Sequence, residues 1–211
     1  MPTPHARYTQ HARVLLALAA TGLGLFLQLF FAVCAVAQTE PPSGLVYGWG
    51  SNDWGELGTE RPYVSFLPLR LNAPNDIIAV SSGMWHTLVL RADGTVWSWG
   101  SNESGALGRG RGCTELPEQI PGLENIVAVA AGERSSLALD RDGKVYAWGC
   151  LNEFLSWDGL DVDYHRPALV EGLNNVIAIA VNGWFALAVC EDGSCWGWGD
   201  NACDQLGPDA A

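Results

Sequence analysis

Thr95-Val96-Trp97-Ser98-Trp99-Gly100 occurs, with changes, four times in this chain of 211 residues. Its closing Trp-Gly pair returns at intervals of 50, 49 and 50 residues. A proline, an apolar run, a glycine and an Asp-Gly pair keep nearly the same step. A period of this length indicates stacked repeat units. The recurring positions are Trp49, Trp99, Trp148 and Trp198; Pro68, Pro117 and Pro167; 77–80, 126–129 and 176–179; Gly83, Gly132 and Gly183; and Asp93, Asp142 and Asp192.

Each unit is predicted to contain four short strands and no helix. The first strand follows the proline, the second is the apolar run, and the third and fourth flank the Asp-Gly pair. An Asp-Gly pair between alternating segments is typical of a two-residue type I′ hairpin, because both central residues need a positive φ. In the first unit the strands are expected at 69–71, 77–80, 85–91 and 95–100.

The fourth strand of each unit has one aromatic face and one face of smaller side chains. Trp97 and Trp99 alternate with Val96 and Ser98, and the other copies keep this alternation. Because side chains alternate along a strand, the large groups of one sheet are expected to fill the space over the small face of the next. Sheets that are buried on both faces by similar sheets form the blades of a propeller.

Two motifs resemble the regulator of chromosome condensation repeat. The first is Trp99-Gly100-Ser101-Asn102 followed by Gly105-Ala106-Leu107-Gly108, with a copy at 49–58. The second is Gly83-Met84-Trp85-His86-Thr87, which precedes the hairpin. The resemblance covers residues 45–207, and it implies a seven-bladed β-propeller built from four-stranded antiparallel blades.

The chain contains only three full units, so the predicted fold is all-β: a partial, three-bladed propeller after an N-terminal signal or anchor segment. We expect a linker at 38–44 and a repeat domain at 45–211, with blades at 67–100, 116–149 and 166–199. Propellers typically close with about four to eight blades. The chain is therefore expected to form an open arc, either as a fragment or as a part that self-associates to complete a ring.

Residues 1–37 differ in composition from the rest of the chain. Arg7 and Arg13 precede an apolar run at 14–37 that ends in Ala35-Val36-Ala37. This layout is typical of a secretory signal peptide cleaved before Gln38. The alternative is an uncleaved membrane anchor, because the run is long enough to cross a bilayer. Both interpretations place the repeats outside the cytoplasm, either secreted or anchored to the membrane.

The charge balance argues against nucleic acid as a partner. All 23 acidic residues and nine of the 11 basic residues follow Ala37, which leaves this part of the chain with a net charge of −14. Affinity for nucleic acid comes mostly from basic side chains that neutralise phosphates. The acidic balance serves solubility or, alternatively, attracts a basic protein partner.

Five cysteines follow Ala37. Cys190 and Cys195 flank the third Asp-Gly pair, and a two-residue turn there would place them opposite each other, close enough for a disulfide. The alternative is that both are small core residues. Cys113, Cys150 and Cys203 are expected in loops, which leaves at least one thiol without a partner inside the chain.

The sequence contains no catalytic, cofactor or zinc motif. The chain is therefore predicted not to be an enzyme, and no cofactor or metal is expected. His86 starts a strand in the resembled motif and is interpreted as structural. Asp158, Asp161 and Asp163 are attributed to a solvated loop, with a Ca²⁺ site as the alternative.

Binding is predicted in the turns, because loops tolerate variation that the blades cannot. The residues after the repeated glycine differ from unit to unit, and protein interfaces favour aromatic and arginine side chains. The alternative is that these aromatic groups pack between blades. The candidate binding residues are Trp54, Met84, Trp85, Glu133, Arg134, Trp157, Trp184 and Phe185.

The predicted function is that of a protein–protein interaction or scaffold module outside the cytoplasm. The resemblance also implies two alternatives: an inhibitor of a secreted enzyme such as a β-lactamase, and a guanine-nucleotide-exchange regulator, which conflicts with the export signal. A glycan-cleaving propeller would need carboxylates that converge on one rim. A light sensor similar to the plant UV-B photoreceptor is disfavoured, because Gly83-Met84-Trp85-His86-Thr87 lacks the arginine of that protein's Gly-Trp-Arg-His-Thr motif.

Overall fold

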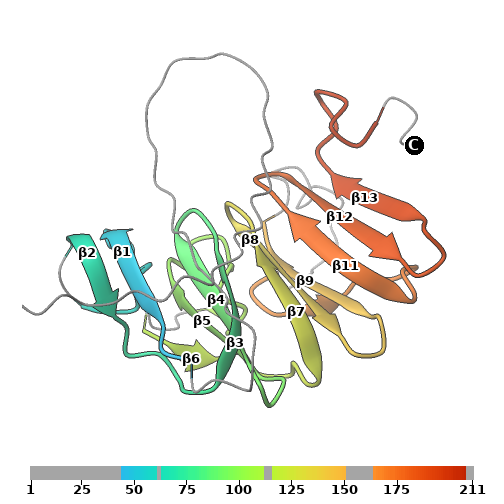
Figure 1. Ribbon diagram of the computed structural model, residues 1–211. Helices are drawn as coiled ribbons and strands as arrows, with labels where there is room; N and C mark the ends of the chain where they lie inside the picture. The colour runs from blue at the N-terminus through green and yellow to red at the C-terminus, as the bar shows by residue number, and fades with distance from the viewer. Residues whose placement is uncertain (1–43, 61–62, 112–115, 151–163, 208–211) are drawn as a thin grey trace, which may run out of the picture.

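Four antiparallel β-sheets stand side by side along the chain in the computed structural model, which describes residues 44–60, 63–111, 116–150 and 164–207 (Figure 1). The all-β prediction is confirmed for these residues. In spatial order, the sheets are β1 (Tyr47–Ser51) and β2 (Val64–Arg70); β3 (Ile77–Ser82), β4 (His86–Arg91), β5 (Val96–Gly100) and β6 (Glu118–Gln119); β7 (Ile126–Ala131), β8 (Ser135–Asp140), β9 (Val145–Gly149) and β10 (Ala168–Leu169); and β11 (Val176–Val181), β12 (Phe185–Cys190) and β13 (Cys195–Gly199).

The sheets are offset by one strand from the predicted blades. The strand that follows each proline pairs with the last strand of the preceding unit, so that Gln119 in β6 lies opposite Trp97 in β5. Each complete sheet thus takes its inner three strands from one sequence unit and its outer strand from the next.

The Asp-Gly hairpins have three-residue loops and not the predicted two-residue turns. In the first, the Gly94 N–H donates to the Arg91 carbonyl and the Arg91 N–H donates to the Thr95 carbonyl, each at 2.9 Å. Only the glycine has a positive φ, of 80°, which is the pattern of a type I turn followed by a glycine bulge. The Asp93 carboxylate accepts the Thr95 N–H at 3.0 Å and closes the turn.

At the first two junctions, neighbouring sheets are joined by a tryptophan that reaches back to the turn of the sheet before it. The indole N–H of Trp99 donates to the carbonyl of Glu56 at 2.7 Å, and that of Trp148 donates to the carbonyl of Ala106 at 2.8 Å. Both tryptophans are almost fully buried. The predicted packing of large groups against small ones therefore occurs, with the small group supplied by the turn glycine of the preceding sheet, Gly58 or Gly108.

The ends of the inner strands also touch across the sheets. A Cβ atom on Gly83 would collide with the carbonyl oxygen of Gly132, and one on Gly132 would collide with that of Asn182. The three residues occupy the same place in their sheets, because the N–H of each donates to the carbonyl of the residue three positions later. The residue equivalent to Gly83 and Gly132 is thus Asn182. It is not the predicted Gly183, which lies one residue later.

No helix long and apolar enough to cross a membrane occurs in the part of the chain that the structure describes. The predicted signal or anchor at 1–37 lies outside that part.

Candidate binding surface on one rim

Three of the predicted binding residues occupy the same position in successive sheets. Their backbone carbonyls accept a hydrogen bond from the residue that follows the third strand of the same sheet, at 2.8 to 2.9 Å. The acceptors are Trp85, Arg134 and Trp184, and the donors are Ser101, Cys150 and Asp200. Because adjacent sheets stand side by side, the three side chains follow one another along one rim.

Their side chains form a continuous row, which we call the rim row: Trp54, Trp85, Arg134 and Trp184. The rings of Trp54 and Trp85 are 6.5 Å apart and inclined at 55°. The guanidinium carbon of Arg134 lies 5.1 Å from the ring centre of Trp85 and 6.0 Å from that of Trp184. These are cation–π distances, so the row alternates aromatic rings with one central cation. Trp54 is exposed, and the other three are partly exposed.

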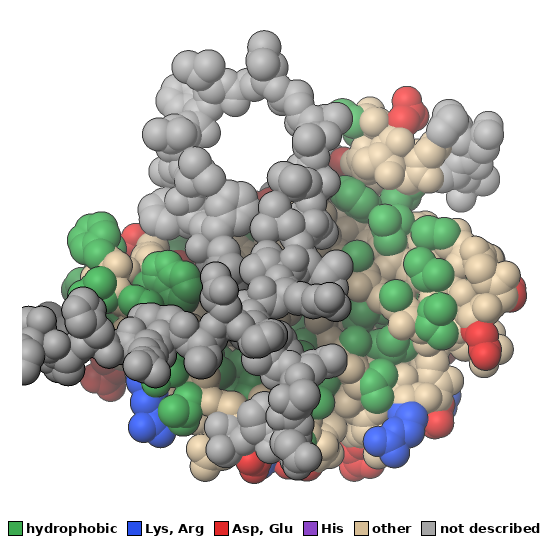
Figure 2. Space-filling view, viewed as in Figure 1, with side chains coloured by type: hydrophobic (Ala, Val, Ile, Leu, Met, Phe, Trp, Pro, Cys, Tyr) green, Lys and Arg blue, Asp and Glu red, His purple; other side chains and the backbone are tan. Residues whose placement is uncertain are grey.

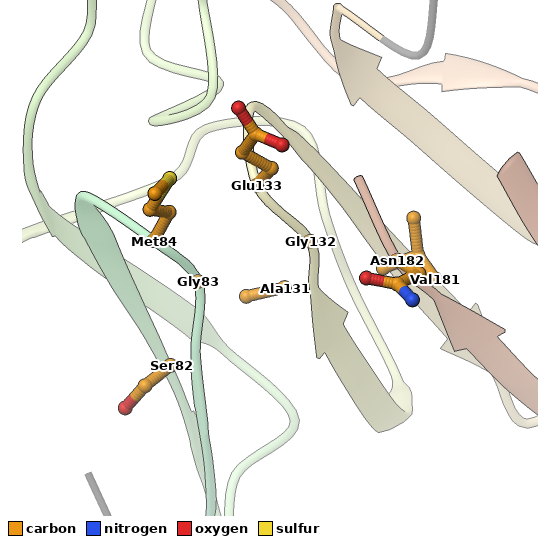
Figure 3. A pocket seen from close by; sticks show the side chains of 8 residues that line it. All are labelled: Ser82, Gly83, Met84, Ala131, Gly132, Glu133, Val181 and Asn182. Atoms are coloured by element: carbon orange, nitrogen blue, oxygen red, sulfur yellow. The ribbon is translucent and has the colours of Figure 1, made fainter. Parts of the chain in front are cut away.

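A shallow hollow of about 280 Å³ lies beside the row, where β3, β7 and β11 end (Figure 3). Its lining combines an exposed thioether, a carboxylate and an amide, on Met84, Glu133 and Asn182. Figure 3 shows these three side chains on successive strand ends. The Glu133 carboxylate lies 3.8 Å from the Nε atom of Arg134, so the hollow and the rim row share one ion pair.

The structure brings most of the predicted binding residues together on this rim, but not all of them. Phe185 starts β12 at the position that His86 holds in β4 and Ser135 in β8, so it is not the equivalent of Trp85. Trp157 and the acidic residues at 158–163 lie outside the described residues. Sequence reasoning missed Asn182, for which the available signal was an asparagine exactly 50 residues after Gly132.

His86 is structural. It is fully buried, and its Nε2 atom lies 2.8 Å from the Ser136 hydroxyl, which itself donates to the Ala106 carbonyl at 2.9 Å. Because the hydroxyl proton is used there, His86 donates through Nε2–H. Burial lowers the pKa of His86 from 6.5 to about 4, so the ring is neutral in the folded chain and holds two sheets together.

The predicted disulfide between Cys190 and Cys195 is not formed. The loop has three residues, because the Cys190 N–H donates to the Ser194 carbonyl at 2.9 Å. Cys195 therefore lies opposite Val189, and the two thiols are on opposite faces of the sheet. Cys190 is buried and Cys195 is exposed, both as free thiols, and so are Cys150 and Cys203.

Among the described residues, no three His, Cys, Asp or Glu side chains gather closely enough to hold a metal ion. The rim row and its hollow thus offer aromatic faces, one cation and one carboxylate.

The sequence profile of the regulator of chromosome condensation (RCC1) repeat matches residues 43–90 and 93–139. A second profile of the same repeat matches residues 77–106, 126–154 and 176–205. The chain belongs to the RCC1 repeat family. Among curated protein sequences, none matches the chain significantly.

Two solved structures resemble the described fold. Prp20p from Saccharomyces cerevisiae, whose description reports binding to Gsp1p and histones, is 29% identical over 78% of this chain, with a TM-score of 0.67. Human WBSCR16 is 28% identical over 74% of the chain, with a TM-score of 0.64. The alignments cover 43% of each of those proteins, so the chain spans less than half of their length.

Proposed function

We propose that this RCC1-repeat chain is a non-enzymatic protein-interaction module outside the cytoplasm, and that the rim row is its recognition surface. The observation that carries the proposal is the row itself: four residues from four sheets in one continuous line of aromatic and cationic groups. Tryptophan and arginine dominate the binding energy of protein interfaces. Domains of this family commonly mediate protein binding, which agrees with this use.

The proposed partner is a protein with a basic surface. The chain carries a net charge of −12 over all 211 residues, and opposite charge speeds encounter between proteins. At the rim, Glu133 offers a carboxylate to a lysine or arginine that enters the hollow, and the exposed thioether of Met84 supplies an adaptable apolar wall. Nucleic acid is disfavoured by the same acidity.

The proposed location rests on residues 1–37, with Arg7 and Arg13 before the apolar run. We propose export, followed by cleavage after Ala37, or retention by the same run as a single membrane anchor. N-terminal sequencing of the chain recovered outside the cytoplasm distinguishes the two outcomes. Recovery only from the cytoplasm would contradict the proposed location.

The function is tested by affinity capture from the exported proteins of an expressing cell, followed by measurements with the purified partner. Trp54→Ala and Arg134→Ala are expected to weaken its binding at least tenfold. Trp196→Ala is the matched control, because Trp196 is also exposed but lies outside the rim row.

Two results would contradict the proposal. One is unchanged affinity in both rim variants. The other is a lower melting temperature in those variants with no change in affinity, which would mean that the aromatic groups serve the packing of the blades. Inhibition of purified β-lactamases by the chain would favour the more specific role of an enzyme inhibitor.

A further inference from the structure

The two ends of the row of sheets carry the two halves of one repeated interface. At the first two internal junctions, the first half is the turn that follows the third strand of one sheet. The second half is the aromatic face of the next sheet. A Cβ atom placed on Gly58 in the first turn would contact the ring of Trp99, and one placed on Gly108 in the second turn would contact that of Trp148. Every tryptophan in this role also donates to a carbonyl of the turn, at 2.7 to 2.8 Å.

The fourth sheet carries the first half of this interface. Its turn at 201–207 has the same internal structure as the others, because the Leu206 N–H donates to the Asn201 side chain at 2.8 Å, as Leu57 does to Asn52. Leu206 also lies over Gly197 as Leu57 lies over Gly48. The contact on the other side differs.

Gly207 has open space where Gly58 and Gly108 have a tryptophan. Leu206 is partly exposed, whereas Leu57 and Leu107 are buried. The turn at 201–207 therefore has the same contact surface as the internal turns, but the described chain packs no tryptophan against it.

The first sheet carries the second half. Trp49 occupies in β1 the position of Trp99 in β5, and Tyr47 on the same face is 50% exposed. Val64 pairs with Ser51 and so lies on this face as well, and strand alternation adds Phe66, which is 91% exposed. Figure 2 shows apolar side chains over β1 and β2 and again over the fourth sheet. Both ends of the molecule therefore expose apolar surface.

Asn182 shows what kind of neighbour fits the fourth sheet. At internal junctions, a glycine leaves room for a backbone carbonyl of the next sheet beside its own α-carbon. At Gly132, this carbonyl is that of Asn182. The side chain of Asn182 occupies that space in the fourth sheet, so a complete four-stranded sheet cannot dock in the same way. The first sheet, as described, has only the two outer strands β1 and β2 and brings no inner strand to this place.

We propose that the chain associates head to tail, with β1 and β2 of one copy docked on β12, β13 and the 201–207 turn of a second copy. Trp49 of one copy packs against Gly207 of the other copy in the way that Trp99 packs against Gly58. Such an interface is heterologous, since it joins two different surfaces. It does not use Trp85, Arg134 or Trp184, so its failure would leave the proposed recognition surface intact.

The test uses two variants that each block one of the two faces. Trp49→Glu removes the aromatic group at one end, and Gly207→Trp fills the docking space at the other. Native mass spectrometry of the 211-residue chain from nonionic detergent is expected to show species of more than one copy for the unaltered chain. Each variant alone is expected to be a single copy. An equimolar mixture is expected to give a complex of two chains, because each variant keeps the face that the other lacks.

Gly122→Trp is the matched control, since Gly122 also has a positive φ and no heavy atom near its Cβ position. This control is expected to associate like the unaltered chain. A single-copy unaltered chain, variants that still associate alone, or a mixture that stays single-copy while circular dichroism shows both variants folded would each overturn the proposal. The mixing result also separates this interface from a symmetric one, which the mixture would not restore.

Discussion

Gly132 and Asn182 occupy the same place in neighbouring sheets, yet only one of them has room for a side chain. The carbonyl of the next sheet lies directly against the α-carbon of Gly132, whereas the side chain of Asn182 is exposed. Glycine thus stands where the described chain packs another inner strand against this position, and asparagine where it does not. The role of Asn182 could not be predicted from the sequence alone, because the neighbouring Gly183 matches the repeated glycine of the motif.

Exchanging these two residue types gives a paired test. Gly132→Asn is expected to lower the free energy of unfolding by about 2 kcal/mol or more, since backbone atoms must move apart. Asn182→Gly should change it by no more than about 1 kcal/mol, through the flexibility of the unfolded chain. Urea unfolding followed by tryptophan fluorescence measures both values. Equal losses would show that the inner strands do not approach as closely as described.

His86 should make the stability of the fold depend on pH. Its pKa is about 4 when folded and 6.5 when exposed, so the unfolded chain binds a proton between these values that the folded chain does not. Stability is therefore complete above pH 6.5 and declines as the pH falls toward 4. From pH 7 to pH 5 the expected loss from this group is about 2 kcal/mol.

The comparison is His86→Ser, because Ser135 stands at the equivalent position of the next sheet. Chemical denaturation at pH 7, 6 and 5 should show a steeper decline for the unaltered chain than for this variant. Identical slopes would mean that His86 is hydrated in the folded chain.

Among the secondary-structure elements, the strands and the hairpins were predictable to different degrees. The alternation of Trp97 and Trp99 with smaller residues predicted β5 and its aromatic face correctly. The hairpin signal predicted a turn at Asp93-Gly94 but not its length, because the Asp93 carboxylate stabilises the three-residue form. That one-residue difference changed the register and removed the predicted disulfide of Cys190 and Cys195.

The tryptophan that joins neighbouring sheets is the most testable contact between elements. Trp148→Phe keeps most of the buried ring and removes the N–H that donates to Ala106 at 2.8 Å. The expected loss is about 0.5 to 1.5 kcal/mol, the net value of one hydrogen bond, because the Ala106 carbonyl keeps the bond from the Ser136 hydroxyl. Trp196→Phe is the control, because Trp196 is exposed and, among the described residues, its indole N–H donates to the Ser194 hydroxyl at 3.3 Å. Thermal unfolding of the two variants compares them, and equal shifts would contradict the role of the Trp148 hydrogen bond.

For the whole molecule, the sequence period predicted the stacking of sheets and the motifs at 83–87 and 99–108 predicted the family. Neither predicted which strands belong to which sheet. The strand after Pro117 reads as the start of a unit and is the outer edge of the previous sheet. Which strands form one sheet depends on which of them lie next to each other in the fold. The repeat has the same period whichever strand is taken as its first, so the period does not show where a sheet begins. The open arc was predicted from the number of repeats, but not that Trp49 and Gly207 lie on its two end faces.

Association through these ends should slow the hydrogen exchange of the strands that it covers. The central strands β4 and β8, whose residues are almost all buried, are expected to exchange slowly at every protein concentration. Strands β1, β2, β12 and β13 are expected to gain protection as the concentration rises, because a second copy covers them. Exchange followed by mass spectrometry at two concentrations tests this, and protection that rises only in β4 and β8 would count against it.

The offset between sequence units and sheets has a consequence for how chains of this kind change in length during evolution. Loss of residues 118–167, one full period between equivalent prolines, would remove β6 to β9 and connect β5 directly to β10. Strand β10 would then pair with β5 as β6 does now, and the fourth sheet would dock where the third one stood. Gain or loss of one internal period by gene duplication or deletion thus needs no new interface, because Asn182 stays in the last described sheet and β1 and β2 stay in the first.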